Sequence, residues 1–108
     1  MATVIKQGDA YALPVGIKLN GKGIAAADID TVEFYIGDSV RKLYPRDATY
    51  DEQSGFFYVP IDQNESFSLP PDDIVTIDAR VKFVGGMVKG VSKKDYITVV
   101  DATSEVVL

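Results

Sequence analysis

The feature that most constrains this chain is a strict alternation of apolar and polar residues between Val75 and Phe83. The odd-numbered positions are all apolar, and the even-numbered positions between them are Thr76, Asp78, Arg80 and Lys82. Successive side chains of a β-strand point to opposite faces, so a period of two is typical of a strand with one face buried and one in solvent. The segment therefore predicts a long strand at the surface of a core.

Six further segments also read as strands, and turn residues separate them. Asn20-Gly21 predicts a hairpin turn, Gly85-Gly86 predicts a tight turn, and Pro14 indicates an edge or the beginning of a strand because proline donates no ladder hydrogen bond. The expected strands, besides the one just described, cover residues 13–19, 31–36, 39–44, 56–60, 87–91 and 96–100.

Two segments have helical character but are too short for an independent helix. Residues 24–30 are expected to form a loop or one helical turn, because Asp28 and Asp30 favour turns. Residues 62–66 carry helix-start residues and predict a single turn across one end of the fold.

About seven short antiparallel strands with turns between them predict an all-β, Ig-like β-sandwich. A chain of 108 residues forms one domain by the usual size priors, so the expected domain is residues 1–108. Hydrophobic residues make up 46% of the chain and cysteine is absent, so one core must hold the fold without disulfides. A small SH3-like barrel is the alternative architecture.

The residue inventory argues against an enzyme. Histidine and cysteine are both absent, which excludes Ser–His, Cys–His and zinc mechanisms. Carboxylate chemistry would need two acids facing each other across a cleft, and we interpret the pairs Asp28/Asp30 and Asp72/Asp73 as turn-forming residues instead. The lone Asp-x-Asp also lacks the further oxygen ligands of a calcium loop. We expect no catalytic residue, no cofactor and no metal.

Charge and hydropathy exclude two classes of partner. The formal net charge is −5 and the basic residues are scattered, so the clustered cations that bind nucleic acid are missing. No apolar run approaches the ~20 residues that span a bilayer, and the first residues lack the basic and apolar regions of a signal peptide. We expect no nucleic acid and no membrane partner.

Tyrosines provide the candidate interaction face. Tyr35 and Tyr58 fall opposite the apolar residues of their strands, and a strip of outward aromatics can anchor a protein partner or stack on a sugar ring. Outward tyrosines are also good strand formers in their own right. Four other aromatic residues are candidates to join the strip: Tyr44, Tyr50, Phe56 and Tyr96.

The order of these features resembles small Ig-like domains of phage and prophage structural proteins, and it is similar to the N-terminal domain of phage baseplate upper proteins. The likeness covers roughly residues 3 to 100 and consists of spacing and turns. The segments that carry it are residues 6–9, 28–35, 50–60, 63–66 and 79–83, with Gly85-Gly86 after the last.

This resemblance implies a non-enzymatic virion structural or assembly module, in a tail, a baseplate or a head accessory position. Its partners would be other virion proteins, and a homo-oligomer is expected because virions repeat subunits around symmetry axes. The protein would be made in the bacterial cytoplasm without a signal peptide and would end in the virion. The alternative is a carbohydrate-binding or adhesive Ig-like module of a bacterial surface protein, which would use Tyr35 and Tyr58 as a sugar platform.

Overall fold

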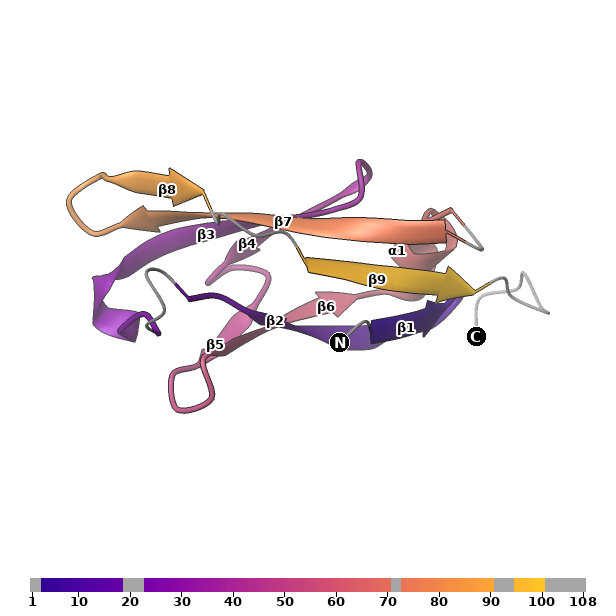
Figure 1. The fold of residues 1–108 in the computed structure, drawn as a ribbon, viewed down its shortest axis with the longest axis horizontal. Coiled ribbons are helices and arrows are strands. Elements are labelled where there is room, and N and C mark those ends of the chain that lie inside the picture. Colours follow the sequence, from indigo (N-terminus) through magenta and orange to yellow (C-terminus); the bar gives the residue numbers. More distant parts are fainter. Residues whose placement is uncertain (1–2, 19–22, 71–72, 91–94, 101–108) are drawn as a thin grey trace.

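The computed structural model describes residues 3–18, 23–70, 73–90 and 95–100. Its strands form two sheets, one of six strands and one of three (Figure 1). The large sheet has the order β1-β9-β7-β3-β4, with β8 paired to β7, and the small sheet has the order β2-β6-β5. The bounds are β1 Thr3–Lys6, β2 Tyr11–Gly16, β3 Ile29–Ile36, β4 Val40–Tyr44, β5 Thr49–Asp51, β6 Phe56–Ile61, β7 Asp73–Phe83, β8 Val88–Gly90 and β9 Asp95–Val100.

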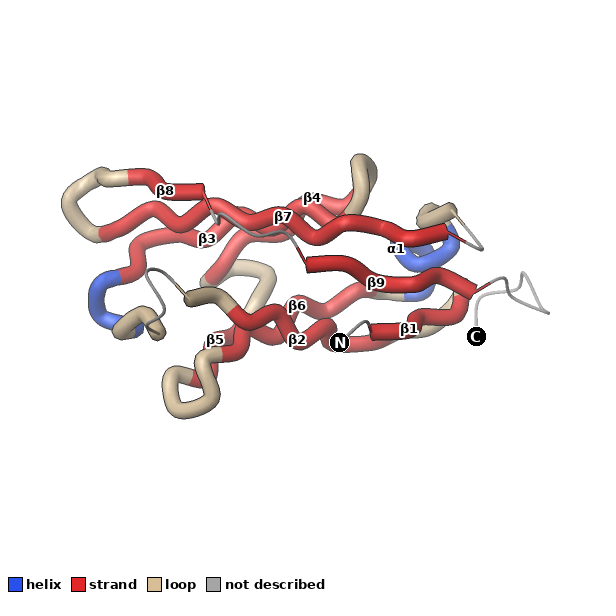
Figure 2. The backbone as a smooth tube through the Cα atoms, viewed as in Figure 1, coloured by secondary structure: helices blue, strands red, loops and turns tan. Residues whose placement is uncertain are grey.

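The sheets lie face to face as two layers, which confirms the predicted β-sandwich (Figure 2). The order β9-β7-β3-β4 opposite β2-β6-β5 is that of strands G-F-C-C′ opposite B-E-D in an Ig-type sandwich. No ladder joins the two sheets within the described residues, so the chain does not form the alternative small barrel.

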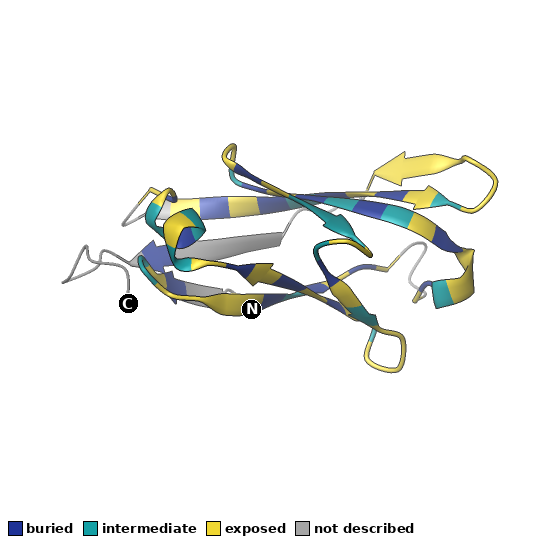
Figure 3. Cartoon of the chain, turned by 180° about the vertical axis from the view of Figure 1, so that it is seen from behind, coloured by how far each residue is buried: buried dark blue, intermediate teal, exposed yellow. Residues whose placement is uncertain are grey.

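The inward-facing residues of both sheets build one hydrophobic core. Burial alternates along the strands, with buried residues at every second position of β6 and of β3 from Val32 to Ile36 (Figure 3). Phe57 at the centre is fully buried and stacks on Tyr50 with ring centroids 4.1 Å apart. Phe34 and Tyr44 contact the same ring at 5.4 and 5.3 Å. The core therefore centres on an aromatic cluster that joins both sheets.

The structure adds two short strands to the predicted seven. β1 pairs in parallel with β9, and β5 pairs with β6 beside the aromatic cluster. The strand expected over residues 13–19 is β2 at residues 11–16, and it is an edge strand, as Pro14 indicates. Residues 19–22, including the expected Asn20-Gly21 turn, lie outside the described residues.

The prediction of a hairpin around Asn20-Gly21 is nevertheless wrong. A hairpin requires its two flanking strands to pair, whereas β2 pairs with β6 and the next strand, β3, pairs with β4 and β7. Between Gly16 and Ile29 the chain crosses from the small sheet to the large one. It does so through a 3-10 turn at Ala26–Asp28, which agrees with the loop or single turn expected over residues 24–30.

One end of the sandwich is closed by the short helix α1, Gln63–Phe67, as the sequence predicts. Asp62 and Glu65 form a capping box, each side chain accepting a hydrogen bond from the other residue's backbone N–H. Lys42 donates to Glu65 over 2.8 Å and so ties β4 to the helix. Opposite it, the backbone N–H of Gly8 donates to the Ser66 hydroxyl over 2.9 Å.

At the other end, β7 and β8 form a hairpin that projects beyond the small sheet (Figure 1). Gly85 and Gly86 have φ angles of +103° and +99°, which glycine adopts far more readily than other residues, so the predicted turn is confirmed. The molecule is elongated, with extents of 46 × 24 × 23 Å. No helix in the part of the chain described here is long and apolar enough to cross a membrane.

Candidate interaction surface

The two predicted site residues do not share a face. Tyr35 and Tyr58 both point outward and are 41% and 38% exposed, but Tyr35 belongs to β3 in the large sheet and Tyr58 to β6 in the small sheet. The outer faces of a two-layer sandwich point in opposite directions, so the expected common tyrosine strip is not formed. The alternation of apolar and polar residues shows whether a side chain points inward or outward. It does not show to which of the two sheets the strand belongs.

Two of the four additional aromatics belong to the core instead. Tyr44 and Tyr50 pack against it, and the Tyr50 hydroxyl donates to the carbonyl of Ile24 over 2.6 Å. Burial raises the pKa of the Tyr50 phenol, although its hydrogen bond to Ile24 acts in the opposite direction. The side chain of Tyr96 lies outside the part that the structure describes.

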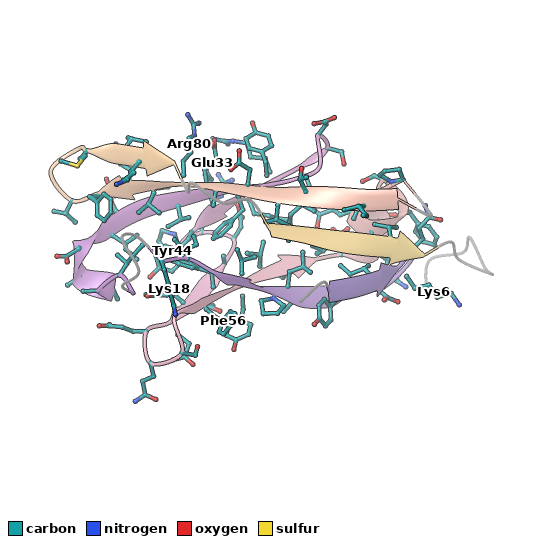
Figure 4. The ribbon with its side chains drawn as sticks, viewed as in Figure 1. Lys6, Lys18, Glu33, Tyr44, Phe56 and Arg80 are labelled. Atoms are coloured by element: carbon teal, nitrogen blue, oxygen red, sulfur yellow. The ribbon has the colours of Figure 1, made fainter. Side chains whose placement is uncertain are left out.

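Phe56 does join Tyr58, on the outer face of the small sheet (Figure 4 labels Phe56). Phe56, Tyr58 and Pro60 alternate with the buried residues of β6, and their ladder partners in β2 are Gly16, Pro14 and Ala12. The Phe56 ring packs across Gly16, where a Cβ atom would lie 3.2 Å from the ring. We call this apolar surface the β6 face; it consists of Ala12, Pro14, Gly16, Phe56, Tyr58 and Pro60.

A hollow of about 520 Å³ borders the β6 face beside Tyr58 and Pro60. Its other wall is the β4–β5 loop, which includes Pro45, Arg46 and Ala48. Asp47 holds this loop in place, because its carboxylate accepts hydrogen bonds from the Arg46 side chain and from the backbone N–H of Leu43, each over 3.0 Å. The Arg46 bond and then the Leu43 bond lower the pKa of Asp47. The Leu43 bond thus connects the loop wall of the hollow to β4.

The outer face of the large sheet has a different chemical character. Glu33 on β3 lies between Arg41 of β4 and Arg80 of β7 (Figure 4 shows Glu33 beside Arg80). Arg41 approaches one carboxylate oxygen to 2.7 Å and Arg80 the other to 2.5 Å. The hydrogen bond from Arg80, together with that from Arg41, lowers the pKa of Glu33 against the opposing effect of burial. This cluster links three adjacent strands.

We expect Glu33→Gln to destabilise the fold by about 1 kcal/mol at neutral pH and by less in acid, since both arginines are largely in solvent. The folded-state pKa of Glu33 lies below its usual value, so the carboxylate stabilises the fold above the unfolded-state pKa. That contribution is lost as the pH falls through the folded-state pKa. Urea denaturation of both proteins from pH 7 to pH ~3 measures it, and Glu52→Gln controls for the loss of one exposed charge. A constant difference across this range would contradict the assignment.

The acidic residues that the sequence analysis singled out are not part of the Glu33 cluster. Asp28 is in the 3-10 turn, and the carboxylate of Asp30 lies 3.8 Å from the Lys82 amine. Asp72 and the side chain of Asp73 are outside the described part. No group of three or more acidic side chains within the described ranges could hold a metal ion.

Sequence reasoning named Phe56 as a candidate neighbour of Tyr58, but it did not predict that Tyr35 lies on the opposite sheet. A usable signal was present, because the run Phe56-Phe57-Tyr58-Val59-Pro60 contains no charged residue at either face of the strand. Strands that are apolar on both sides are typical of sheets covered on both faces. The inner side of β6 is covered by the core, whereas its outer side is exposed in this chain.

Comparison of the chain with protein-family models, with curated proteins and with solved structures finds no match. The two outer faces of the chain differ in chemistry: the β6 face on the small sheet is apolar, and the outer face of the large sheet carries Glu33 between Arg41 and Arg80.

Proposed function

We propose that this chain is a non-enzymatic structural or assembly module of a phage or prophage virion, in a tail, baseplate or head accessory position. It would act through protein–protein contacts made by the β6 face. The resemblance to Ig-like domains of phage structural proteins supports the virion context. Residues 50–60, which are among the segments that carry this resemblance, form the β5–β6 hairpin that presents Phe56 and Tyr58.

The observation that carries the proposal is the contrast between the two outer faces. Six neighbouring outward positions on β2 and β6 are apolar, and four of the six side groups are those of proline or an aromatic residue. On the large sheet, the outward positions of β3 and β7 near Glu33 are mainly charged or polar. Contiguous exposed apolar surface marks contact sites in soluble proteins, and aromatic residues supply much of the binding energy there.

We expect Tyr58→Ala to weaken binding to the virion partner about 10- to 100-fold, because Tyr58 lies between Phe56 and Pro60 at the centre of the β6 face. Each structural protein encoded beside this gene would be purified, and its affinity for the chain measured by biolayer interferometry. Tyr35→Ala is the matched control, since Tyr35 is equally exposed on the opposite sheet and its loss should leave affinity unchanged.

Two results would contradict the proposal. One is the absence of binding to every neighbouring structural protein. The other is specific binding on a glycan array that is lost with Tyr58→Ala, which would identify the β6 face as the sugar platform of an adhesive module.

A further inference from the structure

The β7–β8 hairpin presents a second exposed apolar group, distinct from the β6 face. Val84, Met87 and Val88 are 67%, 71% and 56% exposed, and we call these three residues the hairpin tip. The backbone beneath them is well ordered by hydrogen bonds: Phe83 N–H donates to the Met87 carbonyl over 2.8 Å, and Val84 N–H to that of Asp28 over 2.9 Å. A pre-ordered apolar tip loses little conformational entropy on binding.

The hairpin is positively charged in a chain that is acidic overall. Residues 82–90 contain two lysines and no acidic residue, whereas the whole chain has a net charge of −5. Lys82 and Lys89 are both exposed, and Lys82 has a loose contact with Asp30 at 3.8 Å. The hairpin tip is therefore an apolar group flanked by cations.

The β6 face has the complementary charge along its β5 edge. Asp51 is the ladder partner of Phe56, and Glu52 follows it in the β5–β6 turn. Both acids are exposed. A cationic, apolar hairpin docked on Phe56 and Tyr58 would thus place its lysines beside these two carboxylates. Such charge pairing favours one orientation of the hairpin on the face over the others.

We propose that the β6 face binds the β7–β8 hairpin tip of a second copy of this chain; this inference rests on the proposed function and names one partner of the same face. The hairpin tip of one molecule cannot contact the β6 face of the same molecule. Its hairpin projects from the large sheet at one end, while its β6 face points outward from the small sheet (Figure 1). Each copy offers one tip and one face. The contact is heterologous, and repetition of it builds rings or open filaments.

The strength of a single contact follows from its size. Three tip side chains on a six-residue face make an interface smaller than the ~1,600 Å² of a standard stable complex. One contact is therefore weak, and copies associate mainly at high concentration or once ring closure makes the last contact intramolecular.

Sedimentation velocity of the full chain over a range of concentrations tests the inference with two variants, Met87→Glu at the tip and Tyr58→Glu on the face. The unaltered chain should form larger species as concentration rises, and each variant alone should stay monomeric. An equal mixture of the two variants should form one-to-one dimers, because Met87→Glu retains an intact face and Tyr58→Glu retains an intact tip. Dimers in the mixture also show that both variants are folded.

Thr76→Glu is the charge-matched control, since it adds the same charge at an exposed position of β7 away from both surfaces and should associate normally. A monomeric unaltered chain up to about 1 mM would overturn the inference, and so would a mixture of the variants that stays monomeric. If the chain stays monomeric while Tyr58→Ala still weakens binding to a virion partner, only this inference fails. If the mixture forms dimers and no virion partner binds, only the proposed function fails.

Discussion

Replacing Phe57 by alanine is expected to lower the free energy of unfolding by about 3–5 kcal/mol, the usual cost of removing a large buried aromatic side chain. Phe57 is fully buried, and its ring contacts Tyr50, Tyr44 and Phe34. Because these residues come from both sheets, the cavity would lie where the two layers meet. A loss of this size should lower the midpoint of thermal unfolding by more than about 10 °C.

The adjacent residue provides the control for this prediction. Phe56→Ala removes an identical side chain that points outward and is 41% exposed, so its cost should stay below about 1 kcal/mol. Urea denaturation of both variants gives the two free energies directly. Similar losses for Phe56→Ala and Phe57→Ala would contradict the alternation of β6 and with it the orientation of the β6 face.

The second large effect concerns Gly8, where alanine is expected to cost about 2–3 kcal/mol. Gly8 has a φ angle of +91°, and a Cβ atom there would lie 2.9 Å from the end of the Phe67 ring. The substitution therefore adds a steric conflict with α1 to the backbone strain that a side chain meets at positive φ.

Gly55→Ala separates the two causes. Gly55 has a φ angle of +77°, but nothing lies within 4 Å of a Cβ atom there, so its cost should be the strain alone, about 1–2 kcal/mol. In a Phe67→Ala background, the cost of Gly8→Ala should fall to the same level, because the conflicting ring is gone. An unchanged cost in that background would mean that the Phe67 ring plays no part. Chemical denaturation of the four proteins in the cycle measures each cost.

Much of the fold could be predicted because apolar and polar residues alternate clearly along its long strands. Val75 to Phe83 predicts β7, and Gly85-Gly86 predicts the turn into β8, since only local chemistry is involved. The strands that were missed lack such a pattern. β1 has four residues, and β5 has three, of which Thr49 and Asp51 are polar and exposed, so period two cannot be recognised in either.

Pairing between distant strands could not be predicted from periodicity, and the site depends on it. Tyr58 and Tyr35 have the same outward position in their strands, and only the assignment of β6 and β3 to opposite sheets separates them. Phe56 gains Gly16 as a neighbour through the β2–β6 ladder. Lys42 shows the same limit of periodicity. It occupies an inward position on β4, and its salt-bridge partner, Glu65, lies on α1, which the pattern of β4 does not indicate.

The parallel pairing of β1 with β9 has a consequence for how the chain acquires its structure during translation. Thr3 is the ladder partner of Ile97, so β1 is synthesised long before the strand that completes its hydrogen bonds. The β2–β6 and β3–β7 ladders also join segments well separated in sequence. Proteins dominated by such distant contacts fold in milliseconds to seconds, more slowly than helical bundles. Until β9 emerges, β1 has no ladder partner among the described strands, and the edge of β7 from Asp73 to Ile77 is uncovered. Such unpaired strands expose a nascent chain to aggregation.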